Sequence, residues 1–158
     1  MLKKVKRGTL SGKGMRIAIV ASMYNQRYVD GMLRAAKGVL KRAGVNAVEI
    51  VRVPGAFEIP VVASALAWRD EDIPDAVICL GLIIQGETSH ADHIGSSVTQ
   101  ALTEIQVDSL VPMIHEVLLV KSEEQARVRC LSRDHNRGAE AANTALTMAR
   151  LLRRICSE

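Results

Sequence analysis

The sequence predicts an α/β fold in which a four-stranded parallel sheet lies between two layers of helices. Four continuous apolar runs have the length expected of strands that are buried on both faces. Segments with apolar residues at helical spacing separate these runs, and glycine or proline marks several of the junctions. Strands that alternate with helices in this way are joined by right-handed crossovers, which predicts a three-layer α/β/α sandwich of flavodoxin-like type.

Each element can be assigned from the same patterns. The expected strands are Arg16–Ala21, Ala47–Val53, Asp75–Ile84 and Met113–Val120. Helices are expected at about 28–43 and 59–68, from the turn at 85–89 to about 109, in a short segment from 122, and at about 136–155. The first of these helices is followed by Gly44, in the position where a helix C-terminus favours glycine.

Composition limits the class of protein. A chain of 158 residues is long enough for one domain with a single sizeable core, and we expect one domain over residues 1–158. Its net charge is +4, but the basic residues are scattered and lack interleaved aromatic residues, so no nucleic-acid partner is expected. No apolar run approaches the roughly 20 residues that cross a bilayer. The three cysteines have no metal-like or redox-like spacing and are interpreted as reduced thiols of a cytoplasmic protein.

Three polar loops follow the first three strands. Because ligands of open parallel sheets bind outside the carboxyl ends of the strands, the loops at 22–25, 54–60 and 86–90 are candidate binding segments. Tyr24 and Phe57 lie in the first two of these loops. Their rings either stack on a planar ligand or close the core, and the sequence leaves both interpretations open.

The third loop carries a candidate phosphate site. Gly86 permits close approach of the backbone to a ligand, and Thr88 or Ser89 is expected to cap the following helix, leaving free N–H groups for an anion. His90, in the first turn, is a candidate general acid-base. The alternatives are an ordinary glycine turn and a surface histidine. A metal site at His90 and His93 is disfavoured, because no partner ligands occur at a useful spacing.

Four arginines near the last two predicted helices form either a solvated basic face or part of an anion site. They are Arg127, Arg129, Arg133 and Arg137.

Several motifs occur together in a fixed order along nearly the whole chain. The most specific is Val53-Pro-Gly-Ala-Phe-Glu-Ile-Pro60. The others are Leu80-Gly81, Gly86-x-Thr88-x-His90, Val111-Pro112, Glu124-Gln125-Ala126 and Asn136-Arg137-Gly138-Ala139. In this order they resemble the lumazine synthase family.

The resemblance implies condensation of 5-amino-6-ribitylaminouracil with 3,4-dihydroxy-2-butanone 4-phosphate to 6,7-dimethyl-8-ribityllumazine, with no cofactor and no metal. By the same resemblance His90 transfers protons, while Arg129 binds phosphate together with Gly86, Glu87 and Thr88. The implied pyrimidine and ribityl contacts are Tyr24, Asn25, Ala56, Phe57, Glu58, Leu82, Ile83 and Ile84. Arg137 occupies a position that is usually lysine.

Some positions depart from the family pattern. His115 replaces an aromatic residue that closes the site from a neighbouring subunit, and Glu116 replaces a glycine. His93 stands where aromatic residues are frequent. Retention of His90 and Arg129 favours an enzyme over the alternative of a flavin- or lumazine-binding paralogue with little turnover. A flavodoxin-like electron carrier is disfavoured, because the first loop lacks a phosphate cradle.

The resemblance also implies a homo-oligomer whose N-terminal lead, residues 1–14, contacts a neighbouring subunit and could add a strand to its sheet. Shell-forming members commonly carry a glycine-containing lysine turn before the last helix. The corresponding segment, 131–137, has no glycine, so we expect a pentamer or paired pentamers rather than a sixty-subunit shell.

Overall fold

A computed structural model describes residues 10–157 and confirms the predicted fold class. The strands form one four-stranded parallel sheet in the order β2-β1-β3-β4. Their bounds are β1 Arg16–Ser22, β2 Ala47–Val53, β3 Ala76–Ile84 and β4 Met113–Val120. The consecutive strands β1 and β2 are neighbours, and the chain then crosses back over β1 to place β3 on its other side.

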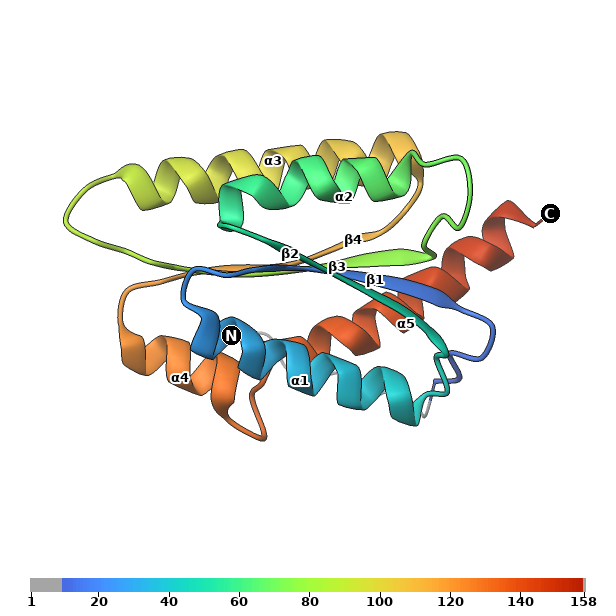
Figure 1. The fold of residues 1–158 in the computed structure, drawn as a ribbon, viewed down its shortest axis with the longest axis horizontal. Helices are drawn as coiled ribbons and strands as arrows, with labels where there is room; N and C mark the ends of the chain where they lie inside the picture. Colours follow the sequence, from blue (N-terminus) through green and yellow to red (C-terminus); the bar gives the residue numbers. More distant parts are fainter. Residues whose placement is uncertain (1–9, 158) are drawn as a thin grey trace.

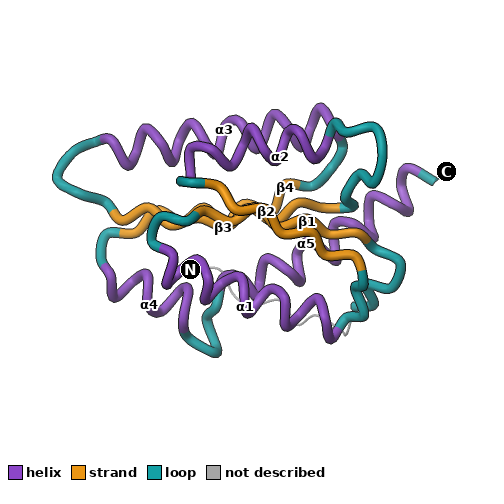
Figure 2. The backbone as a smooth tube through the Cα atoms, in the orientation of Figure 1, coloured by secondary structure: helices purple, strands orange, loops and turns teal. Residues whose placement is uncertain are grey.

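Helices cover both faces of this sheet. Their bounds are α1 Gln26–Arg42, α2 Ile59–Ala67, α3 His90–Ser109, α4 Glu123–Leu131 and α5 Arg137–Cys156, with a short 3₁₀ turn, η1, at Ala56–Glu58. Figure 1 shows α2 and α3 above the sheet and α1, α4 and α5 below it. Figure 2 shows the strands as a single layer between these two sets of helices.

The core is divided by the sheet because successive side chains of a strand point to opposite faces. Ile17 and Ile19 of β1 pack in the cluster shared with α1 and α5, whereas Ala18 and Val20 pack in the cluster shared with α2 and α3. All four residues are fully buried. This two-sided burial explains why β1 is a continuous apolar run rather than an alternating one.

One helix start and one helix cap differ from the sequence-based expectation. Helix α1 begins at Gln26 because Asn25 adopts a left-handed conformation, with φ of 56°, and so ends the preceding loop. Ser89 does precede α3, but neither of the proposed capping side chains caps this helix, so that prediction was wrong. The N-terminus of α5 is capped, since Asn136 Oδ1 accepts a hydrogen bond of 2.9 Å from Gly138 N.

The N-terminal lead is only partly described. The predicted contact with a neighbouring subunit falls mainly on residues 1–9, which lie outside the described residues. The remainder, residues 10–14, contacts its own chain: Leu10 packs against the α1 and α5 side of the core, and Gly12 N donates to Ala43 O at 2.7 Å. Within the described part of the chain, no helix is both long enough and apolar enough to cross a membrane.

Helix α5 approaches α1 so closely that only glycine fits at the contact. A Cβ atom at Gly138 would lie 2.0 Å from the carbonyl oxygen of Met32, which is backbone and cannot rotate away. Gly138→Ala should therefore lower the free energy of unfolding by about 1–3 kcal/mol, as measured by denaturant titration.

Gly38 of α1 supplies the matched control, because a Cβ there would meet only the flexible end of Arg42, at 3.4 Å. Gly38→Ala should raise the free energy of unfolding by roughly 0.5–1 kcal/mol through helix propensity. Similar effects of the two substitutions would contradict the close contact between α1 and α5.

Candidate active site

A cleft of about 580 Å³ opens at the carboxyl ends of β1, β2 and β3. Its volume lies in the range of small-molecule binding sites. The lining residues are Tyr24, Asn25, Ala56, Phe57, Glu58, Leu82, Ile83, Ile84, His90, His93, Ile94 and Ser97. The structure thus brings together nine of the residues proposed from the sequence, from the two loops after β1 and β2, the end of β3 and the first residue of α3.

Hydrogen bonds hold the first two loops against each other and against β3. Met23 N donates to Val53 O at 2.8 Å, and Tyr24 N donates to Pro54 O at 3.0 Å. The side-chain amide of Asn25 donates to Leu82 O at 2.8 Å. The loop after β1 is therefore fixed on both sides, which sets the position of the Tyr24 ring.

The Tyr24 ring lies over Gly55. A Cβ atom at Gly55 would come within 2.8 Å of the Tyr24 ring, so the close approach requires glycine at this position. Tyr24 and Phe57 are 70% and 62% exposed, and neither ring fills the core. Of the two interpretations left open by the sequence, the structure thus favours rings that present their faces to a ligand.

Glu58 is tied down at the same loop. Its carboxylate accepts a hydrogen bond of 2.8 Å from Gly55 N, across the η1 turn. One oxygen of Glu58 is thereby occupied, and the second oxygen can accept a hydrogen bond from a donor in the cleft.

The end of β3 offers backbone groups to the cleft. Pairing of β1 with β3 stops at Ala21 and Leu80, whereas pairing of β3 with β4 continues to Ile84 and Val120. Gln85 N donates to Val120 O, toward β4. Because alternate residues of a strand direct their polar groups to opposite edges, the N–H and C=O of Ile84 face the cleft.

Helix α3 forms the other wall. His90, His93, Ile94 and Ser97 are spaced three, four and seven residues apart and so lie on one face of the helix. His93 Nε2 lies 3.4 Å from Ser89 Oγ. His93, Ile94 and Ser97 are not among the substrate contacts expected from the sequence, although helical periodicity counted from His90 identifies all three.

Gly86, Glu87 and Thr88 do not line the cleft. They are exposed in the loop that joins Ile84 to His90, both of which do line it. Addition of a Cβ at Gly86 would meet no atom within 4 Å, so the space beside this backbone is open. No group of three or more metal-ligating side chains occurs among residues 10–157.

Three further candidates lie away from this cleft, around the middle of β4. His115 faces α3, where its Nε2 lies 2.8 Å from Thr99 Oγ1. The Thr99 hydroxyl donates to Gly95 O, so its oxygen accepts from His115 Nε2–H. His115 Nδ1 in turn accepts from Val117 N at 3.2 Å. Both contacts suit a neutral imidazole, and burial lowers the pKa of His115 despite an opposing backbone hydrogen bond.

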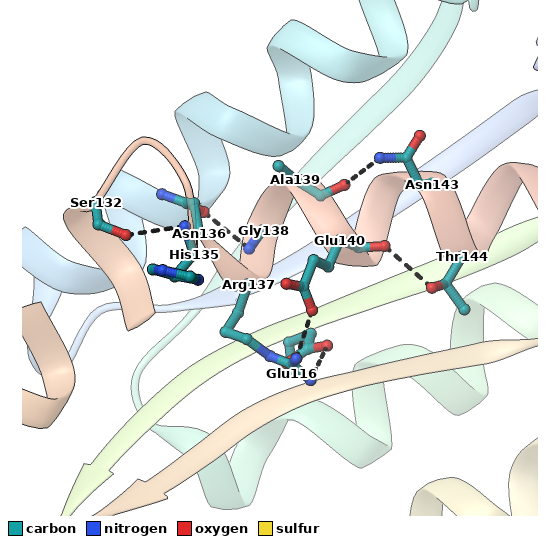
Figure 3. Close-up of polar contacts among 10 residues, drawn as sticks. All are labelled: Glu116, Ser132, His135, Asn136, Arg137, Gly138, Ala139, Glu140, Asn143 and Thr144. Atoms are coloured by element: carbon teal, nitrogen blue, oxygen red, sulfur yellow. Dashed lines mark hydrogen bonds and ion pairs between the residues drawn. The ribbon is translucent and has the colours of Figure 1, made fainter. Parts of the chain in front are cut away.

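Glu116 and Arg137 form an ion pair on the opposite face of β4 (Figure 3). Arg137 donates from Nε and Nη2 to the two carboxylate oxygens of Glu116, both at 3.0 Å. A third donor, Nη1, is bound by Glu140. Arg137 is therefore held by two carboxylates of its own chain, and it does not line the cleft as a substrate contact would.

The four arginines do not form one cluster. Arg127 is exposed and pairs with Glu124 on the same helix, α4. Arg129 is also exposed on α4, and it has no hydrogen-bond or ion-pair partner among residues 10–157. The charge of Arg129 lowers the pKa of Glu116, as the charge of Arg137 does more strongly.

Comparison with known proteins gives a consistent result. Residues 14–153 match the family model described as 6,7-dimethyl-8-ribityllumazine synthase. A protein of that name from Mycolicibacterium vanbaalenii is 43% identical, over 92% of this chain and 92% of its own length. Another from Clostridium kluyveri is 36% identical, over 96% of this chain and 99% of its own length.

The lowered pKa of His115 makes stability depend on pH. Below its ordinary pKa of 6.5, His115 of the unfolded chain takes up a proton that the folded chain excludes. The free energy of unfolding should therefore fall as the pH is lowered from about 7 to about 5.5. His115→Gln should reduce this slope in denaturant titrations, whereas His135→Gln, at an exposed histidine, serves as the control. An unchanged slope in His115→Gln would contradict the assignment of a half-buried neutral imidazole.

Proposed function

The chain belongs to the 6,7-dimethyl-8-ribityllumazine synthase family, and we propose that two copies of it build each active site. It is a transferase of riboflavin biosynthesis. It condenses 5-amino-6-(D-ribitylamino)uracil with 3,4-dihydroxy-2-butanone 4-phosphate, giving 6,7-dimethyl-8-ribityllumazine, phosphate and water.

The cleft supports a place for the pyrimidine. The exposed rings of Tyr24 and Phe57 can stack on a flat heterocycle, and the free backbone groups of Ile84 can hydrogen-bond to its edge. Leu82 and Ile83 complete this strand end, while Asn25 fixes it to the first loop. Ala56 and the free oxygen of Glu58 are suited to the ribityl chain.

The loop before α3 and its first turn are suited to the ketone phosphate. Gly86, Glu87 and Thr88 lead into the N-terminus of a 20-residue helix, whose free N–H groups favour an anion. His90 then lies between the phosphate and the pyrimidine. In that place it can deliver a proton to the carbonyl oxygen during amine attack. It can also remove a proton from carbon before phosphate leaves.

Binding the two substrates next to each other contributes to the rate enhancement, in addition to proton transfer by His90. Imine formation between the pyrimidine amine and the ketone is bimolecular in solution. Binding both reactants in one cleft makes it effectively unimolecular, and well-oriented groups reach effective molarities on the order of 10⁵ M or more. Ring closure by the ribityl-bearing nitrogen, with loss of water, then takes place within the same bound molecule.

The positions of His115, Arg129 and Arg137 support a shared site. Glu116, the partner of Arg137, lies four residues before the end of β4. That is roughly 13 Å from the end of the strand at about 3.3 Å per residue. These groups lie around β4, an edge strand of the described sheet, and in the proposed assembly the cleft of a neighbouring copy lies against this edge. In a closed ring with head-to-tail interfaces, every copy can place its β4 edge against the cleft of the next copy.

The carrying observation is the cleft that unites Tyr24, Phe57 and His90 at the strand ends, in a chain of this family. Purified protein should convert the two substrates to a product with lumazine absorbance. A protein that binds both substrates without forming this product would refute the enzymatic assignment.

The free cysteines support a reducing compartment, the cytoplasm.

Mixing two defective variants tests the shared site. His90→Ala should lower kcat by roughly 10²–10⁴-fold, and Arg129→Ala should raise the KM for the ketone phosphate, because a charge-assisted contact is lost. After dissociation and joint reassembly at equal amounts, about one quarter of the interfaces combine two intact halves. Activity at low ketone phosphate should then approach one quarter of the unmodified protein. Activity no higher than the mean of the separate variants would contradict a site built from two copies.

We propose a pentamer or paired pentamers as the assembly. Side chains organise the turn before α5: His135 N donates to Ser132 Oγ, and Asn136 caps the helix (Figure 3). This turn has no glycine to give it the conformational freedom of the shell-forming turns. Light scattering after gel filtration should give a mass of five or ten chains. A monomer with full activity, or a sixty-subunit particle, would refute this assembly.

A further inference from the structure

Glu116 is a buried carboxylate in a part of the chain that the proposed reaction leaves unexplained. It is 7% exposed in the middle of β4 and receives two hydrogen bonds from the Arg137 guanidinium. Burial raises the pKa of Glu116, and the charge and hydrogen bonds of Arg137 lower it. This buried carboxylate therefore depends mainly on Arg137 for its charge balance.

The same contacts determine what Arg137 can do. Two parallel N–H groups bind Glu116, and a third N–H binds Glu140 (Figure 3). A guanidinium in this geometry lies along β4. To extend toward a phosphate it would have to break the paired bonds and leave the Glu116 charge buried without a partner.

Charge gives a second, independent effect. The two carboxylates and the single guanidinium carry a net charge of about −1 between them. Arg129 is the other cation that acts on Glu116. The charge of Arg129 interacts with that of Glu116, so this negative group offsets part of the attraction that the Arg129 guanidinium exerts on an anion.

We propose that Glu116 is a positioning residue that weakens phosphate binding, by keeping Arg137 on β4 and by offsetting the charge of Arg129. This inference rests on the proposed function, in which the phosphate of the ketone substrate binds at Arg129. In this chain the phosphate of the ketone substrate is then bound by Arg129, while Arg137 stays paired with Glu116.

The test is Glu116→Gln, which keeps the size of the side chain and an acceptor for Arg137 but removes the charge. The KM for the ketone phosphate should fall by about three- to tenfold, and the KM for the pyrimidine should change by less than about twofold. Inorganic phosphate, titrated calorimetrically, should bind more tightly by a similar factor. The gain should shrink as salt is added, because screening weakens the charge effect.

Glu124→Gln is the matched control, because it removes one negative charge from an exposed residue of α4 that pairs with Arg127. It should leave both KM values unchanged. Glu140→Gln removes the other carboxylate and should lower the same KM by less. If the Glu116→Gln protein does not assemble, the Glu140→Gln variant tests the same charge effect.

An unchanged or higher KM for the ketone phosphate in assembled Glu116→Gln would overturn the proposal. An equal fall in Glu124→Gln would also overturn it, because the effect would then be one of net charge alone. Failure of the proposed function has a different outcome, in which the unmodified protein forms no lumazine. A KM that is insensitive to Arg129→Ala would instead remove Arg129 from the phosphate site.

Discussion

The parallel pairing of β1 with β3 at the centre of the sheet is the constraint on which the rest of the molecule depends. These strands are buried on both faces, and every other layer packs against them. Their parallel direction brings the ends of β1, β2 and β3 to one side of the sheet. The pairing also stops at Leu80, four residues before β3 ends, which leaves the N–H and C=O of Ile84 facing the cleft.

The candidate site residues fall into two groups that lie apart in the described chain. One lines the cleft between the strand-end loops and α3. The other surrounds the middle of β4, with His115 on one face of the strand and the Glu116–Arg137 pair on the opposite face. Because β4 is an edge strand of the described sheet, this second group lies at the edge of the sheet rather than between strands. A reaction that needs both groups links catalysis to assembly, and a contact that closes a ring then also completes the site.

In β4, burial and hydrogen-bond partners together determine the charge states of two adjacent residues, His115 and Glu116. His115 is half-buried with one hydrogen-bond donor and one acceptor satisfied, which suits its neutral form. Glu116 is more deeply buried and stays compatible with a charge only through Arg137. Adjacent residues of one strand thus meet the cost of desolvation in different ways, the first by neutrality and the second by pairing.

The sequence alone determined the layers and most of the cleft. Continuous apolar runs identified the strands, with the bounds of β2 and β4 matching those of the structure, because burial on both faces leaves no polar position. The loops after those strands supplied Tyr24, Phe57 and His90, since loop position follows from strand direction. Only the tertiary structure decided that Asn25 binds Leu82, that Gly86, Glu87 and Thr88 lie outside the cleft, and that Arg137 is bound by Glu116. These contacts depend on register and on the packing of helices against the sheet, and local periodicity carries no information about either.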